Sequence, residues 1–170
     1  TFIMRAEVPA RVSAGREEGG EGMEIHAKHA GGMTFLARGG SNHWVVMDSD
    51  PAVGGDDAGA RPMELLLMGL AGCTGMDVIS ILRKKRVAVE GFEIRVHGDR
   101  REEHPKAFTN IEIEYIFIGR DLPRHHLERA VELSQEKYCG AAATLRAAAT
   151  ISHRITIREP EEAETEQVRA

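Results

Sequence analysis

Two cysteines, Cys73 and Cys139, are the residues of this chain best suited to chemistry. Cys73 lies between Gly72 and Thr74 in the most apolar stretch, and Cys139 precedes Gly140 where a helix is expected to break. A thiolate attacks the O–O bond of a peroxide, and the resulting sulfenic acid condenses with a second thiol to a disulfide. The pair is therefore the minimum set for a thiol peroxidase, although free cysteine is also common as a small core residue.

Two acidic residues share the apolar stretch with Cys73. Asp77 follows Cys73 by four residues and so shares its helical face. Because an ionised carboxylate there would raise the thiol pKa, we expect Asp77 to be solvated or paired rather than catalytic. Glu64 lies about 180° around the helix from Cys73, and we expect it to orient a cation that stabilises the thiolate. Arg38 is the candidate cation. The alternatives are a helix N-terminal charge for Glu64 and an ordinary surface position for Arg38.

The composition argues against several other classes of protein. A formal net charge of -5 disfavours nucleic acid as a partner, because phosphate binding requires a surplus of Lys and Arg. The histidines show no metal-ligand spacing, and no Gly-rich phosphate loop leads into a helix, so neither a metal nor an organic cofactor is expected. Two cysteines without a denser disulfide framework indicate a reducing compartment, and we expect a cytoplasmic protein.

The elements that would position these side chains centre on residues 63–82. This stretch is long enough to span a bilayer, but it contains Glu64 and Asp77, and no second hydrophobic span accompanies it. A buried central helix is the better interpretation. Pro62 suits its first turn, and the basic run at residues 83–86 complements the negative end of its dipole.

Alternating segments predict the remaining elements. The expected strands are residues 23–29, 33–38, 43–48, 91–99, 108–119 and 150–158, and a second helix over 124–138 is followed by a broken continuation. This order predicts an α+β fold with antiparallel sheets and helices packed on one side. We expect a folded domain at 23–158, a flexible N-terminal segment at 1–22 and an acidic flexible tail at 159–170.

Two motifs resemble the OsmC/Ohr family, which comprises osmotically inducible protein C and the organic hydroperoxide resistance proteins. The first is the central helix, with its Pro-Met-Glu-Leu-Leu-Leu start at residues 62–67 and the Gly-Cys-Thr of 72–74. The second is the Glu-Lys-Tyr-Cys of 136–139. The resemblance covers residues 24–157. It implies an intertwined homodimer with the sheets outside, the long helices at the centre and active sites between subunits.

The resemblance also assigns roles to residues. It implies that Cys73 is the peroxidatic cysteine and Cys139 the resolving one. The peroxidases of this family carry a Glu directly after the Pro, paired with an Arg from the N-terminal strands. Here Met63 follows Pro62 and the carboxylate of Glu64 comes one place later, while Arg38 is the arginine nearest the expected position. The chain is thus similar to the OsmC-like branch.

The predicted function is a thiol-dependent peroxidase that reduces organic hydroperoxides to alcohols in oxidative stress defence. An external dithiol would reduce the Cys73–Cys139 disulfide, and the protein would act as a cytoplasmic homodimer without membrane or nucleic-acid partners. An apolar lining expected from Leu66, Met68, Leu70 and Met76 favours an organic peroxide over hydrogen peroxide; the alternative is that these side chains simply form core. The alternative is an OsmC-like stress or small-ligand-binding protein without efficient peroxidase turnover.

Overall fold

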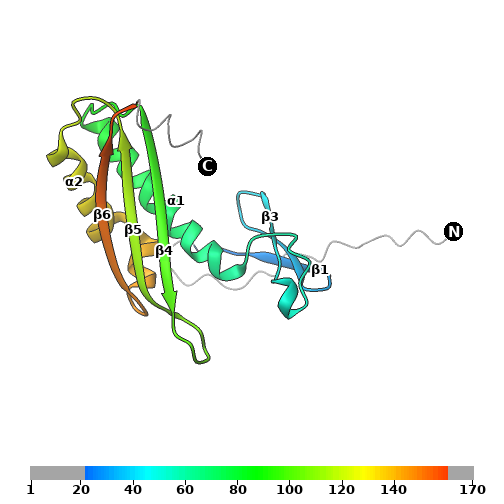
Figure 1. Cartoon of the computed structure of the whole chain (residues 1–170). Coiled ribbons are helices and arrows are strands. Elements are labelled where there is room, and N and C mark those ends of the chain that lie inside the picture. Colours follow the sequence, from blue (N-terminus) through cyan, green and yellow to red (C-terminus); the bar gives the residue numbers. More distant parts are fainter. Residues whose placement is uncertain (1–21, 161–170) are drawn as a thin grey trace.

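A long helix joins two lobes of unequal size (Figure 1). The computed structural model describes residues 22–160, and almost all of the predicted flexible ends, 1–22 and 159–170, lie outside that range. The small lobe is a three-stranded sheet, and the large lobe is a second three-stranded sheet with helices on one face. The prediction of an α+β fold with two sheets and a long helix is confirmed.

The small lobe is an antiparallel meander. It contains β1 (His26–Gly31), β2 (Thr34–Arg38) and β3 (Trp44–Met47), paired in the order β1-β2-β3. Gly31 and Gly32 form the first turn with φ values of 115° and 52°. Glycine adopts these left-handed conformations without a steric cost, which explains the sharp reversal at this point in the sequence.

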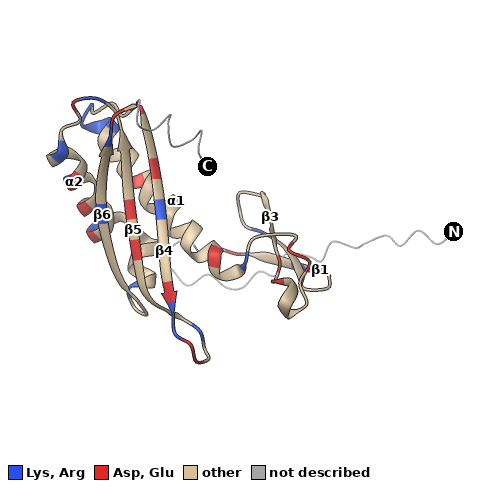
Figure 2. Ribbon diagram, in the orientation of Figure 1, with Lys and Arg blue, Asp and Glu red and all other residues tan. Residues whose placement is uncertain are grey.

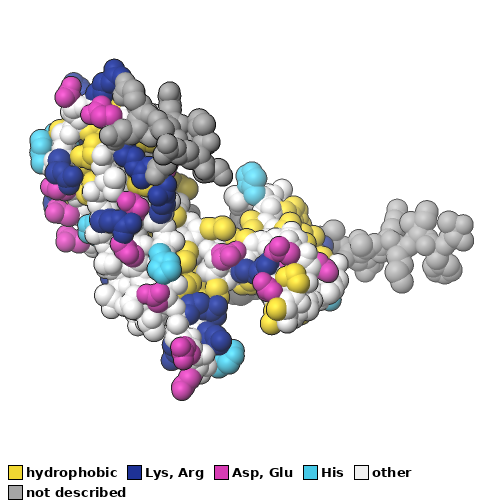
Figure 3. Space-filling view, in the orientation of Figure 1, with side chains coloured by type: hydrophobic (Ala, Val, Ile, Leu, Met, Phe, Trp, Pro, Cys, Tyr) yellow, Lys and Arg dark blue, Asp and Glu magenta, His cyan; other side chains and the backbone are white. Residues whose placement is uncertain are grey.

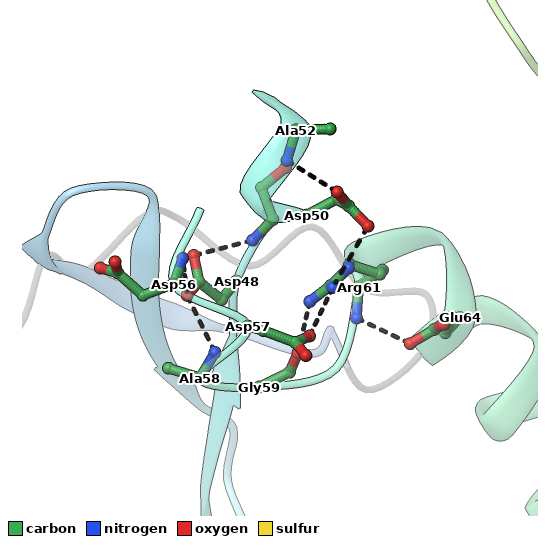
Figure 4. A network of polar contacts seen from close by, with 10 residues as sticks. Asp48, Asp50, Ala52, Asp56, Asp57, Ala58, Gly59, Arg61 and Glu64 are labelled. Carbon is green, nitrogen blue, oxygen red and sulfur yellow. Dashed lines mark hydrogen bonds and ion pairs between the residues drawn. The ribbon is translucent and has the colours of Figure 1, made fainter. Parts of the chain in front are cut away.

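The loop that leads from β3 to the long helix is organised by the buried carboxylate of Asp48 (Figure 4). Backbone amides of Ser49, Asp56 and Ala58 donate to it at 2.7, 3.0 and 3.0 Å. These hydrogen bonds, that of Ala58 first, lower the pKa of the Asp48 carboxyl. The loop also contains the short 3-10 helix Pro51–Val53, and it delivers the chain to the start of α1 in a defined direction.

The long helix α1 spans Pro62–Lys84 and confirms the predicted central helix. Proline occupies its first turn, where no backbone N–H donor is needed, and Arg83 and Lys84 lie in its last turn. The fully buried side chains recur every fourth residue on one face: Leu70, Thr74, Val78 and Leu82.

Several apolar side chains of α1 outside the row from Leu70 to Leu82 are exposed in the single chain, which differs from the buried central helix that the sequence predicted. Leu66, Met68 and Met76 are 47%, 54% and 75% exposed. Among the described residues, this is the one helix whose length and composition would allow it to cross a membrane. Apolar side chains also gather over the small lobe and the neck (Figure 3). One chain supplies packing partners for one face of α1 only.

The sheet of the large lobe contains β4 (Gly91–Arg100), β5 (Phe108–Ile118) and β6 (Thr150–Arg158), in the order β4-β5-β6. β4 and β5 are antiparallel, but β6 is parallel to β5. The expected antiparallel pairing is thus found in the small lobe and between β4 and β5, whereas β6 departs from it. The segment between β5 and β6 is helical and long enough to cross over the sheet, which is what a parallel pair requires.

That crossover consists of α2 (Arg124–Leu133), one π-helical turn (Ser134–Tyr138) and α3 (Gly140–Leu145). The π turn replaces the end of the helix predicted over 124–138. α1, α2 and α3 cover one face of the sheet, and the core lies between these layers. Figure 2 shows charged residues along β4 and β5. Arg154 of β6 forms ion pairs with Glu112 and Glu114 of β5.

Candidate functional site

The two cysteines meet where α1 passes the junction between the π turn and α3. The Sγ atoms of Cys73 and Cys139 and a carboxylate oxygen of Asp77 all lie within 4.8 Å of one another. Both cysteines are free thiols. Cys73 is half-buried in the middle of α1, and Cys139, 66 residues further along, is 3% exposed. The two sulfur atoms are therefore close enough to react with each other after a small movement.

The backbone around Cys139 explains its orientation. The π turn ends at Tyr138, and Cys139 takes an extended conformation that caps α3. Its Sγ atom accepts a hydrogen bond from the amide of Ala142 at 3.3 Å. Burial, and then the neighbouring Cys73 thiol, raise the pKa of Cys139 to about 11. The Cys139 thiol is thus protonated at neutral pH. Of the two cysteine residues, Cys73 is the more exposed.

A buried hydrogen-bond network surrounds the hydroxyl of Thr74, the residue after Cys73. The Thr74 hydroxyl is hydrogen-bonded to that of Tyr115 at 2.6 Å and to that of Ser134 at 2.8 Å. The Gln135 side-chain amide donates to Tyr115 Oη at 2.6 Å. Thr74, Tyr115, Ser134 and Gln135 are all buried, and together they join α1, β5 and the π turn.

The carboxylate of Asp77 sets the direction of this network. Ser134 Oγ donates to Asp77 Oδ2 at 3.1 Å, so Ser134 must accept from Thr74. Thr74 in turn accepts from Tyr115, which accepts from Gln135. At the far end, Arg146 Nη2 donates to Gln135 Oε1 at 2.8 Å. Every donor points from the guanidinium towards the carboxylate, an arrangement in which each hydrogen bond polarises the next.

These network residues were not apparent from the sequence. Thr74 and Ser134 occur at ordinary positions on helical stripes, and Tyr115 belongs to a simple strand alternation. Only the crossover after β5 brings them together. Of the two settings expected for Asp77, solvated or paired, the structure shows the second: Asp77 is half-buried beside both thiols and accepts a hydrogen bond from Ser134. Its four-residue spacing from Cys73 was the signal that pointed there.

Glu64 and Arg38 lie away from the thiols in the single chain. The Glu64 carboxylate accepts from the backbone amide of Arg61 at 2.9 Å and caps α1 (Figure 4). Arg38 donates to Asn42 Oδ1 at 2.5 Å and stacks over Trp44, with its guanidinium carbon 4.9 Å from the ring centroid. The structure does not bring the two together, and the predicted catalytic role of each stays a prediction.

Arg61 is the cation nearest the start of α1. It pairs with Asp57 at 2.5 Å and more distantly with Asp50 at 3.9 Å (Figure 4). The hydrogen bond that the Arg61 guanidinium donates to Asp57 is the main cause that raises the pKa of Arg61. This arginine was not singled out from the sequence, because its partners lie in an irregular loop whose shape depends on Asp48.

A groove opens beside the thiol site. The groove has a volume of about 440 Å³. It is lined by Asp77 and by Ile81, Leu133 and Tyr138 from the helices on either side. Lys84 and Lys85 line it as well, seven and eight residues beyond Asp77 on the chain. The groove therefore combines an apolar wall with a carboxylate towards one end and two ammonium groups towards the other.

Comparisons with known proteins agree with this architecture. Protein YhfA of Escherichia coli strain K12 is 43% identical over 131 residues, which cover 77% of this chain and 95% of YhfA. A hypothetical protein from Aquifex aeolicus VF5 has a crystal structure with a TM-score of 0.69 and 35% identity, covering 82% of this chain and 99% of that one. A Legionella pneumophila structure named as an organic hydroperoxide resistance protein OsmC has a TM-score of 0.63 at 12% identity, covering 82% and 99% of the two chains, which indicates a shared fold.

The match to a family profile covers the elements that build the site. The profile described as OsmC-like protein matches residues 54–154, a range that contains α1, both cysteines and the crossover between β5 and β6. More than half of the chain is thus included, in line with the identity to YhfA. The chain belongs to the family of OsmC-like proteins.

Proposed function

We propose that the protein is a thiol-dependent peroxidase with a role in oxidative stress, reducing organic hydroperoxides to alcohols. The observation that carries this proposal is the approach of two free thiols to within 4.8 Å, one half-exposed and one buried. Membership of the OsmC-like family supports it. Solved structures of the same fold include proteins named for organic hydroperoxide resistance, from Legionella pneumophila and Bacillus subtilis.

The proposed cycle divides the labour between the two cysteines. The Cys73 thiolate attacks the terminal oxygen of ROOH, the O–O bond breaks, and ROH leaves with the proton lost by the thiol. The Cys139 thiol then attacks the Cys73 sulfenic acid, and a disulfide and water form. An external dithiol reduces the disulfide by exchange. In sum, ROOH and two thiols give ROH, water and one disulfide.

The differing environments of the thiols support this order of events. Cys139 has a raised pKa and is buried, so it is a poor first nucleophile but is held ready for the second step. The network through Thr74 and Ser134 keeps the π turn against α1, so that Cys139 faces Cys73. Their positions make Thr74 and Ser134 positioning residues rather than groups that touch substrate.

A second function is favoured by the place of Asp77. A peroxidase benefits from a cation beside its attacking thiolate, whereas here a carboxylate lies within 4.8 Å of both sulfur atoms. Negative charge disfavours a second negative charge nearby. The alternative is therefore an OsmC-like stress or small-ligand-binding protein with slow peroxide turnover, its ligand held in the groove beside Asp77.

We also propose that the working form is a homodimer. The exposed apolar residues of α1 and of the small lobe are the surfaces that a second copy would cover. Monomeric soluble proteins rarely expose large contiguous apolar patches. A dimer of this kind would bury the open face of α1 and place a second chain near the thiol site.

The test is a single-turnover reaction of the reduced protein with cumene hydroperoxide, followed by intact mass and by counting free thiols. Wild type should lose both thiols and form one intramolecular disulfide. Cys73→Ser should leave the peroxide unconsumed, and Cys139→Ser should accumulate a sulfenic acid that dimedone captures. Equal, slow peroxide loss in wild type and Cys73→Ser would favour the ligand-binding alternative.

A further inference from the structure

The donor atoms of Cys73, Cys139 and Asp77 have the spacing of a tetrahedral metal site. In such a site Zn–S distances of about 2.3 Å and Zn–O distances of about 2.1 Å place neighbouring donors roughly 3.6–3.8 Å apart. The three atoms here all lie within 4.8 Å of one another. Closing around an ion would therefore require movements of about 1 Å or less, which side-chain rotations can supply.

Two of the three donors are preorganised by one helix. Cys73 and Asp77 are four residues apart on α1, so their side chains project from the same face one turn apart. The third donor, Cys139, is held by the extended cap conformation before α3. No short sequence motif announces this site, because 66 residues separate the two cysteines and only the fold joins them.

Outer contacts orient two of the donors. Ser134 Oγ donates to Asp77 Oδ2 at 3.1 Å, and the amide of Ala142 donates to Cys139 Sγ at 3.3 Å. Hydrogen bonds of this kind fix the direction of metal ligands and are a regular part of metal sites. Ser134 is itself held by Thr74 in the buried network, so the carboxylate cannot turn away freely.

The charges and donor types select the class of ion. Two thiolates and a carboxylate carry three negative charges, which repel one another unless a cation lies between them. Thiolate donors favour zinc and other thiophilic ions over magnesium or calcium, which prefer oxygen. Zinc sites with three protein ligands take water in the fourth position, and Cys73 is half-buried rather than fully enclosed.

We propose that Cys73, Cys139 and Asp77 form a binding site for one thiophilic divalent cation, with zinc as the ion of best fit. Binding forms two M–S bonds and one M–O bond, releases the protons of the two thiols to solvent and transfers no electrons. An occupied site and a Cys73–Cys139 disulfide exclude each other, because oxidation converts the two thiolate ligands into neutral disulfide sulfurs, which are poor metal ligands. The ion would hold the pair reduced, and oxidation to the disulfide would release it.

The experiment uses the full-length chain, reduced, stripped of metal and kept free of oxygen. Zinc is titrated against a chromophoric chelator, and cadmium is added separately to record sulfur-to-metal charge-transfer absorption. We expect one zinc per chain and a cadmium–thiolate band. Cys73→Ser and Cys139→Ser should each weaken zinc binding at least a hundredfold, and disulfide formation with diamide should abolish it.

The Asp77→Asn variant tests the third donor without a change of shape. It should bind zinc at least tenfold more weakly and keep the cadmium–thiolate band, while the control Glu128→Gln, at an exposed ion pair on α2, should match wild type. A circular dichroism spectrum equal to that of wild type is the criterion that Asp77→Asn is folded. Absence of the thiolate band, or zinc affinities in Asp77→Asn or Cys73→Ser equal to wild type, would overturn the proposal. No peroxide is added in these titrations. The zinc result therefore does not depend on whether the protein is a peroxidase.

Discussion

Thr74 is the residue on which the buried network depends, and Thr74→Val removes its hydroxyl while keeping nearly the same volume. The hydroxyl has hydrogen-bonded partners in Tyr115 at 2.6 Å, Ser134 at 2.8 Å and Gln135 at 3.3 Å. A buried hydrogen bond has a net contribution of about 1 kcal/mol, and an unsatisfied group costs about 1–3 kcal/mol. In the variant, Tyr115 still accepts a hydrogen bond from Gln135, and Ser134 still donates one to Asp77, so these two hydroxyls keep part of their hydrogen bonding. We expect a loss of about 2–3 kcal/mol.

The assay is urea unfolding of the reduced protein at one fixed protomer concentration, since the stability of a dimer depends on concentration. With a slope of about 2 kcal/mol per molar urea, the midpoint should fall by roughly 1 M. Thr144→Val is the matched control. Its exposed hydroxyl donates to Gly140 O at 2.8 Å within α3, and the change should stay within about 0.5 kcal/mol.

The same variant separates structure from chemistry. Loss of the Thr74 hydroxyl loosens the π turn that carries Cys139, so disulfide formation after peroxide addition should slow several-fold. The initial oxidation of Cys73 should keep its rate. If Thr74→Val were as stable as Thr144→Val and formed its disulfide at the wild-type rate, the network would not be what holds Cys139 towards Cys73, and this reasoning would be refuted.

Three further results are expected. Asp77→Asn removes a negative charge beside Cys73, and in the metal-free protein it should speed oxidation of Cys73 by peroxide about fivefold. The reason is the loss of about 1 kcal/mol of charge repulsion at this separation in a water-like dielectric. Stopped-flow measurement of thiol loss gives the rate, and a rate equal to wild type contradicts the prediction. Met76→Lys, at a side chain 75% exposed in one chain, should convert the proposed dimer to monomers in sedimentation, and an unaltered mass would place the interface elsewhere. Amide hydrogen bonds lower the pKa of Asp48 below 3.8, so its stabilisation is present above that pH and lost as pH falls through the lowered value. Melting temperatures of Asp48→Asn and wild type should therefore converge in acid, and a constant gap between them argues against this linkage.

Local patterns in the sequence determined most elements of this protein. The sequence predicted α1 to within a few residues from Pro62, the apolar run after it and the basic residues at the end of that run. This was possible because helix capping and hydrophobic periodicity depend on residues within a few turns of one another. Strict alternation likewise predicted β5 and β6. The two cysteines were selected by chemistry alone, since few side chains can act as nucleophiles.

Tertiary structure decided how those elements meet. Contacts between segments far apart in sequence determine three features of the site: the parallel pairing of β6 with β5, the π turn before Cys139, and the chain of hydroxyls from Tyr115 to Ser134. Asp77 shows the difference most clearly. Its helical face followed from its spacing, but its partners come from the crossover after β5. Periodicity records which way a side chain points, whereas the packing of distant elements determines what it faces.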